Sequence, residues 1–187
     1  MGALLIWLDR AGFEQIAGIE QGSRGLNDMA RYHGRIFRVS NVVDGDTLDI
    51  EAPEKDKDYT RLRLWGVDTP ETKHPQLGVC YFGPQASEFA AQMVLDKDVT
   101  IYLIENDTRD KYDRLLAYVK LPDGRYLNEE LISEGFGYAD FRFRHDFYNK
   151  YKQLEASARR EQKGLWKEVT VDKMPPWRQK YESKDLN

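Results

Sequence analysis

Cysteine is almost missing from this 187-residue chain, in which Cys80 stands alone. A single thiol excludes an intrachain disulfide and any metal site built from several cysteines. Long apolar runs are missing too: the run from Ala3 to Leu8 has six residues, far short of the roughly 20 that span a membrane. That run also lacks a basic flank and a small-residue cleavage site, so we expect no secretory signal and no membrane segment. These features are compatible with any cellular compartment.

A surplus of positive charge is missing as well, because the formal net charge is −4. Nucleic-acid-binding domains are usually basic, so the net charge alone argues against a nucleic-acid-binding protein. The charge is unevenly distributed, however. Residues 41–60 hold seven acids and two lysines, whereas residues 141–167 hold eight bases and three acids. Such a chain could bind a cation at one end and a polyanion at the other, although charge runs are more often solvated surfaces.

The pattern of apolar residues predicts one small domain with strands and helices. The apolar share of 41% and the charged share of 32% are typical of a globular chain with one core. Period-2 alternation and turn residues predict five strands, over residues 35–43, 48–51, 60–67, 99–104 and 115–121. Helices are expected from Pro84 to about residue 97, at 127–133 and at 146–165.

These elements predict an α+β fold, namely a five-stranded OB-fold β-barrel with about three helices. The barrel domain should cover residues 35–167. We expect residues 1–34 to be an N-terminal extension, because they show no sustained periodicity, and residues 168–187 to be a C-terminal tail.

Three polar clusters stand out, and each has an ordinary structural explanation by itself. Residues 44–47 (DGDT) form either a simple hairpin turn or a pair of carboxylates for a hard cation. Residues 61–72 place two arginines before a DTPET segment, as in a salt-bridged loop or a phosphate clamp beside a metal. Residues 108–114 combine arginines, a lysine and a tyrosine. Together the clusters supply a cation site, a carboxylate and arginines, which attack on a phosphodiester requires.

Taken in order, these segments resemble the staphylococcal nuclease (thermonuclease) family. The matching pieces are VVDGDT (42–47), RLRLWGVDTPETKHP (61–75), GPQASEF (83–89), TRDKYDRLLAYV (108–119) and LNEELISEGF (127–136). The match runs from about Arg35 to Trp166, in the family's order and spacing. The resemblance implies an OB-fold nuclease that uses Ca²⁺ to cut DNA and RNA and leaves 3′-phosphate ends.

The resemblance also implies a metal site and a base. Asp46 and Asp68 align with the two carboxylates that bind calcium, and Thr69 aligns with the residue that offers its backbone carbonyl oxygen. Glu71 aligns with the glutamate that orients and deprotonates the attacking water. A carboxylate of ordinary pKa is a weak base, so the ion must help to lower the pKa of the water.

Arg63 and Arg114 align with the family's two arginines that hold the scissile phosphate. The residues implied to contact the substrate elsewhere are Lys111, Tyr112, Phe141 and Phe143. The two phenylalanines replace tyrosines and can stack on unpaired bases, so single-stranded or fraying substrate should be preferred. We expect Arg142 and Arg144 to bind the nucleic-acid backbone at a distance from the reacting phosphate.

One position in the motifs departs from the family. Asp113 stands where family members often have glycine, and its carboxylate could pair with Arg114 or Arg61.

Two other interpretations stay open beside the nuclease, which we expect to be monomeric. The chain could be a non-catalytic nucleic-acid-binding module on the same barrel, or an OB-fold adaptor for protein or oligosaccharide. The complete set of acids and arginines favours the enzyme. The preferred nucleic acid and the cellular location stay undetermined.

Overall fold

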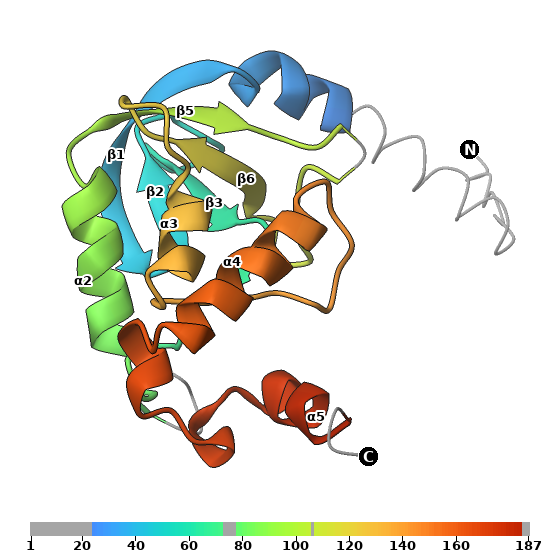
Figure 1. Cartoon of the computed structure of the whole chain (residues 1–187). Helices are drawn as coiled ribbons and strands as arrows, with labels where there is room; N and C mark the ends of the chain where they lie inside the picture. Colours follow the sequence, from blue (N-terminus) through green and yellow to red (C-terminus); the bar gives the residue numbers. More distant parts are fainter. Residues whose placement is uncertain (1–23, 73–77, 106, 185–187) are drawn as a thin grey trace, which may run out of the picture.

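The computed structural model describes residues 24–72, 78–105 and 107–184, and its centre is a closed barrel of five strands (Figure 1). Around the barrel the strands follow the order β1 (Arg35–Asp44), β2 (Thr47–Ile50), β3 (Thr60–Leu64), β6 (Leu115–Lys120) and β5 (Asp98–Tyr102). β3 and β6 run parallel, and every other neighbouring pair is antiparallel. The α+β fold with a five-stranded OB-fold barrel is therefore confirmed.

Alternation along β3 decides which of its side chains face the core. Thr60, Leu62 and Leu64 are buried, whereas Arg61 and Arg63 are only partly buried and lie on the opposite face. The first five residues of β6 are all buried, because this strand lies between β3 and β5 and α3 (Leu127–Ser133) packs on it. The barrel thus holds the two arginines on its outer side.

The strand expected over residues 60–67 is interrupted in the structure. Gly66 adopts a φ of 75°, a left-handed conformation that glycine reaches without steric strain. The chain turns there, and a separate strand, β4 (Val67–Asp68), pairs with β7 (Tyr138–Ala139) instead of continuing along the barrel. Asp68 lies opposite Tyr138 in this small sheet.

The three expected helices are present as α2 (Gly83–Val94), α3 and α4 (Tyr148–Arg160). α2 packs against β1, and α3 packs against α2 and α4. α4 ends earlier than expected, since Gln162 and Gly164 take left-handed φ values of 53° and 49°. Among the helices that the structure describes, none is long and apolar enough to cross a membrane.

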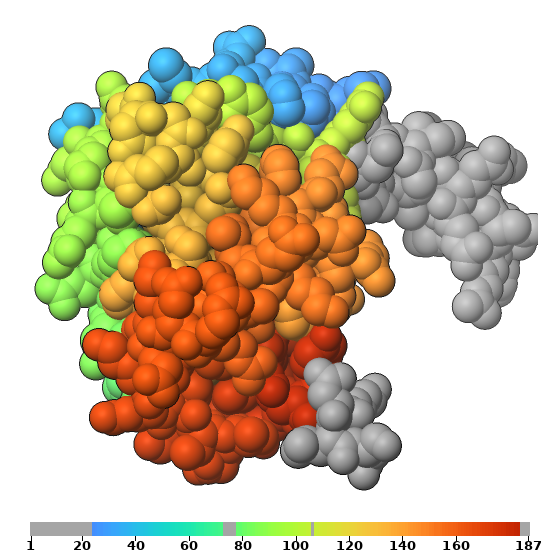
Figure 2. All heavy atoms as spheres, in the orientation of Figure 1, coloured from blue at the N-terminus to red at the C-terminus, as the bar shows by residue number. Residues whose placement is uncertain are grey.

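Two additional helices lie in the stretches expected to be extension and tail. Residues 24–32 form a helix, and its Tyr32 is fully buried and hydrogen-bonded to Thr60 at 3.1 Å. The tail continues through two short 3₁₀ turns, η1 (Gly164–Lys167) and η2 (Val171–Lys173), to α5 (Pro176–Lys184). In Figure 2 the red atoms of the C-terminal segment adjoin the orange atoms of α4. The outer limits of the predicted division fall at residues 1–23 and 185–187, which lie outside the described residues.

Candidate functional site

Two of the predicted metal ligands and one predicted arginine meet at the rim of the barrel. Asp46 comes from the tight turn between β1 and β2, Asp68 from β4 and Arg63 from β3. The Arg63 guanidinium forms an ion pair with Asp46, and its Nη2 donates a hydrogen bond to Asp68 Oδ1 at 2.8 Å. The Arg63 side chain is only 13% exposed. The structure therefore brings these three side chains into one poorly solvated cluster.

A hydrogen bond from Thr69 joins the DTPET segment to the DGDT turn. The Thr69 backbone N–H donates this hydrogen bond to Asp46 Oδ2 at 2.7 Å. The approach depends on Gly45, because a Cβ there would lie 2.8 Å from Thr69 Oγ1. The Thr69 hydroxyl is buried and has no hydrogen-bond partner among the described residues. A buried hydroxyl without a partner is costly, so this oxygen is available to a ligand.

Arg114 reaches the same cluster from the turn that precedes β6. Asp110 holds it, accepting a hydrogen bond from Arg114 Nε at 2.8 Å. Arg114 Nη1 donates to Thr47 Oγ1 at 3.3 Å, and Thr47 Oγ1 donates to Asp46 Oδ1 at 3.1 Å. A continuous chain of polar contacts therefore joins Arg114 to the acidic turn.

Burial dominates the electrostatics of this cluster. It lowers the pKa of Arg63, against the opposing charge of Asp68, and the positive charge of Arg114 lowers it further. Burial also raises the pKa of Asp44, although Arg63 and Thr47 act in the opposite direction. Arginine remains charged in proteins, so both guanidiniums are suited to bind a phosphate, although in this structure Arg63 is paired with Asp46 and Asp68 and Arg114 with Asp110.

Glu71 is exposed and follows the buried residues Thr69 and Pro70. Its carbonyl oxygen accepts a hydrogen bond from the Cys80 N–H at 3.0 Å. A Cβ at Gly83 would lie 2.4 Å from that same oxygen, so the start of α2 packs directly on the Glu71 backbone. This packing fixes the main chain at position 71, while the catalytic role of the side chain stays a prediction.

The four predicted substrate contacts differ in exposure. Tyr112 is 69% exposed, and the charged groups of Lys111 and Arg114 lie 4.9 Å and 5.5 Å from its ring centre. Phe143 is 58% exposed. Phe141 is instead partly buried, with its ring centre 4.9 Å from that of Tyr181. Tyr112 and Phe143 therefore offer open rings, whereas Phe141 packs against the tail.

The pairing expected for Asp113 is wrong. Its carboxylate forms ion pairs with Lys55, at 2.5 Å, and with Arg24. Asp113 takes a left-handed φ of 68°, where glycine would be unstrained. Arg61 and Arg114, the partners expected for Asp113, form ion pairs with other carboxylates. Arg61 pairs with Asp49 and Arg114 pairs with Asp110, each at 2.7 Å.

The expectation that Arg142 lies far from the reacting centre is also wrong. Arg142 Nη2 donates to Asp68 Oδ1 at 2.8 Å, and Asp140 holds the same guanidinium at 2.7 Å. The reason is the β4–β7 pairing, which places the segment after Tyr138 beside Asp68. A further contact that the sequence did not indicate comes from the tail, where Trp177 Nε1 donates to Asp68 Oδ2 at 2.8 Å.

The cluster offers oxygen atoms of the kind that hard cations bind, although both of its carboxylates are paired with Arg63 in this structure. No group of three or more His, Cys, Asp or Glu side chains suited to a metal occurs in the described ranges. Asp46 and Asp68 nevertheless provide carboxylate oxygens, and the unpartnered Thr69 hydroxyl lies beside them, while the role of the Thr69 carbonyl oxygen stays a prediction. Oxygen ligands of this kind suit Ca²⁺ or Mg²⁺, both of which complete their coordination with water.

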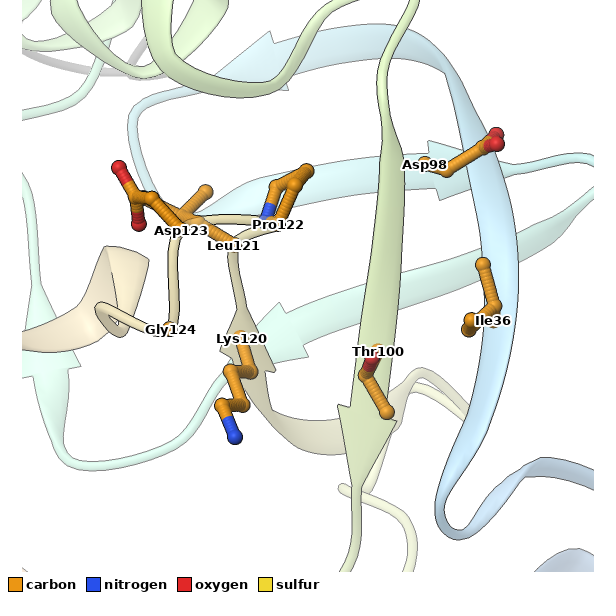
Figure 3. Close-up of a pocket in the computed structure, with 8 residues that line it drawn as sticks. All are labelled: Ile36, Asp98, Thr100, Lys120, Leu121, Pro122, Asp123 and Gly124. Atoms are coloured by element: carbon orange, nitrogen blue, oxygen red, sulfur yellow. The ribbon is translucent and has the colours of Figure 1, made fainter.

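A separate hollow lies on the outside of the barrel, across β1, β5 and the turn after β6 (Figure 3). Ile36, Thr100, Lys120 and Asp123 are among its lining residues. None of the predicted site residues borders it, so the hollow is distinct from the cluster.

The fold and the cluster define an α+β OB-fold protein with acids and arginines on the barrel rim. A sequence model of the family described as "Staphylococcal nuclease homologue" matches residues 61–168. The chain belongs to this family. It is 36% identical over 155 residues to a thermonuclease of Staphylococcus intermedius, a match that covers 82% of this chain and 88% of the relative.

Other relatives give similar values. A thermonuclease of Staphylococcus hyicus is 34% identical over 148 residues, which is 79% of this chain and 85% of the relative. A protein of Escherichia coli O157:H7 named "Uncharacterized endonuclease" is 30% identical over 154 residues, covering 79% and 84%.

Proposed function

We propose that this protein is a Ca²⁺-dependent endonuclease that hydrolyses phosphodiester bonds in DNA and RNA and leaves 3′-phosphate ends. The observation that carries the proposal is the convergence of Asp46, Asp68 and Arg63, with Arg114 connected to them through Thr47. Family membership and relatives named thermonuclease or endonuclease support the same chemistry.

Asp46, Asp68 and the carbonyl oxygen of Thr69 would hold the cation. When bound, it would supply positive charge beside the phosphate and lower the pKa of a nearby water. In this structure both carboxylates are paired with Arg63, so positive charge from the chain itself lies beside them.

The arginines would bind the scissile phosphate and stabilise the charge that builds up as water attacks. Arg114 is held by Asp110 before substrate arrives, so little reorganisation is needed at the reacting group. Glu71 would accept the proton of the attacking water. The new bond forms between the water oxygen and phosphorus, and the bond to the 5′ oxygen breaks. The 5′ oxygen takes up a proton from a solvent water molecule, which leaves the phosphate on the 3′ side.

The decisive experiment incubates the full chain with single-stranded DNA, duplex DNA and RNA, in Ca²⁺ and in an excess of chelator, followed by end-group analysis. The proposal expects cleavage only with Ca²⁺ and 3′-phosphate ends. Cleavage that persists in chelator would contradict the cation, and 5′-phosphate ends would contradict the direction of attack. Substrate binding without cleavage under every condition would favour a non-catalytic nucleic-acid-binding module instead.

A further inference from the structure

The tail contributes a hydrogen bond to a carboxylate at the centre of the site. Trp177 lies in α5, beyond the segment 61–168 that matches the family. Its indole N–H donates to Asp68 Oδ2 at 2.8 Å, although the two residues are 109 positions apart. Arg63 and Arg142 both donate to the other oxygen, Oδ1, at 2.8 Å. Asp68 is therefore held by three donors, from β3, from the turn after β7 and from α5.

The indole is fixed in place by its surroundings. Its ring centre lies 6.5 Å from that of Tyr138, in an edge-on arrangement, and the Arg142 guanidinium lies over it at 4.6 Å. Tyr138 is the β-sheet partner of Asp68. Tyr138 thus packs against Trp177 through its ring and pairs with Asp68 through its backbone. This arrangement links the position of the donor, Trp177, to that of the acceptor, Asp68.

The residue that follows Trp177 anchors the helix. Arg178 is 1% exposed and forms ion pairs with Glu155 of α4 and with Glu182 of α5. Five aromatic rings surround its guanidinium, those of Tyr138, Phe141, Trp166, Trp177 and Tyr181. A buried, fully paired arginine cannot leave this position cheaply, so α5 is firmly docked beside the site.

We propose that Trp177 is a positioning residue for the divalent-cation site, because it orients the carboxylate of Asp68 through Oδ2. The inference rests on the proposed function, in which Asp68 is a cation ligand. Hydrogen bonds to a ligating carboxylate fix its orientation, and their loss typically weakens metal binding by about 10- to 100-fold. The indole is also a neutral donor. Unlike the two guanidiniums on Oδ1, it can hold the carboxylate without repelling a cation.

The test measures Ca²⁺ affinity by titration calorimetry on the full chain, with Ca²⁺ as the only added ligand. Trp177→Phe keeps an aromatic ring beside Tyr138 but removes the N–H donor. We expect it to weaken Ca²⁺ binding by about 10-fold. The Ca²⁺ concentration for half-maximal cleavage should rise by the same factor, and the rate at saturating Ca²⁺ should change much less.

The matched control is Tyr181→Leu, in the same helix. Tyr181 packs on Phe141, with ring centres 4.9 Å apart, and loosening this contact tests whether tail docking alone matters. We expect wild-type Ca²⁺ affinity for this variant, and urea unfolding should show that both variants are folded.

The outcomes separate the two proposals. Unchanged or tighter Ca²⁺ binding by Trp177→Phe, with normal binding by the wild type, overturns the positioning role and leaves the nuclease intact. Equal weakening by Tyr181→Leu also overturns it, since docking rather than the N–H would then be responsible. If the wild type binds Ca²⁺ no better than Asp68→Asn, the proposed cation site itself fails.

Discussion

Replacing Arg178 with methionine should destabilise the fold strongly, since it removes one partner of a buried ion pair. Arg178 is 1% exposed and its partner Glu155 is 3% exposed. Methionine fills much of the same volume but leaves the Glu155 carboxylate buried without its counter-charge. Removing one member of such a pair typically costs about 3–5 kcal/mol of the free energy of unfolding.

The local structure places the expected cost within this range. Glu155 Oε2 also accepts the Ala139 N–H at 2.8 Å, which survives the substitution and satisfies only part of the carboxylate. Arg178 Nε additionally donates to Glu182 at 2.8 Å, and that bond is lost. For a chain of this size, about 1 kcal/mol lowers Tm by about 2–4 °C, so Tm should fall by roughly 6–20 °C.

Proton linkage provides a second signature. Burial raises the pKa of Glu155 even though Arg178 opposes the shift, and removing Arg178 should raise that pKa further. A carboxyl group whose folded pKa lies above its unfolded value favours the folded state when protonated. The destabilisation that this group causes is therefore absent below the unfolded pKa. It grows as pH rises from the unfolded pKa to the folded pKa. The deficit of Arg178→Met should shrink between pH 7 and pH 5.

Urea unfolding at both pH values, monitored by circular dichroism, measures these effects. Arg159→Met is the control, because Arg159 is 38% exposed and its pair with Glu182 should be worth less than about 1 kcal/mol. In the double variant Glu155→Gln/Arg178→Met, removal of the charge should restore part of the stability. The reasoning fails if the free energy of unfolding of Arg178→Met lies within about 1 kcal/mol of the wild-type value. It also fails if the loss of stability does not depend on pH.

Three further predictions concern the site and its surroundings. Arg63→Ala should lower the cleavage rate at saturating substrate by at least about 100-fold. Arg61→Ala should not, because Arg61 lies on the same strand face but pairs with Asp49, and equal losses would refute the assignment. Phe143→Ala should weaken binding of single-stranded DNA by about 1–3 kcal/mol in a fluorescence titration, with little change for duplex, and a uniform loss would argue against stacking. Asp113→Gly should relieve the left-handed strain but lose the ion pairs with Lys55 and Arg24. Burial raises the pKa of this aspartate, yet the Lys55 hydrogen bond and nearby arginines lower it overall, so its stabilisation is present at pH 7 and disappears as pH falls through the folded pKa. Urea unfolding should show glycine gaining relative to aspartate near pH 3, and a constant difference would exclude the ion pairs.

Much of the fold was predictable from local patterns. Alternation in TRLRL predicts a strand with Leu62 and Leu64 inside and Arg61 and Arg63 outside, and the structure confirms it. Pro84 correctly predicted the start of α2 to within a residue. Such signals survive because burial on one face of a strand or helix imposes a period on the sequence itself.

The motifs also indicated which residues would gather. DGDT and DTPET named Asp46 and Asp68, and the structure joins them through Arg63 and the Thr69 N–H. Their roles toward cation, water and phosphate stay predictions, as do those of Glu71 and the substrate contacts. Motifs can indicate these residues because each motif fixes residue types and their spacing within a short stretch of sequence.

The long-range partners were decided by tertiary structure alone. Gly66 turns the chain so that Asp68 pairs with Tyr138, and only this pairing brings Arg142 and Trp177 to the carboxylate. The sequence of the tail likewise gave no sign that Arg178 would be buried, since a lone arginine usually remains at the surface. Contacts between residues 74 and 109 positions apart leave no periodic trace along the chain. Their energy depends on where the barrel, β7 and α5 come together in space.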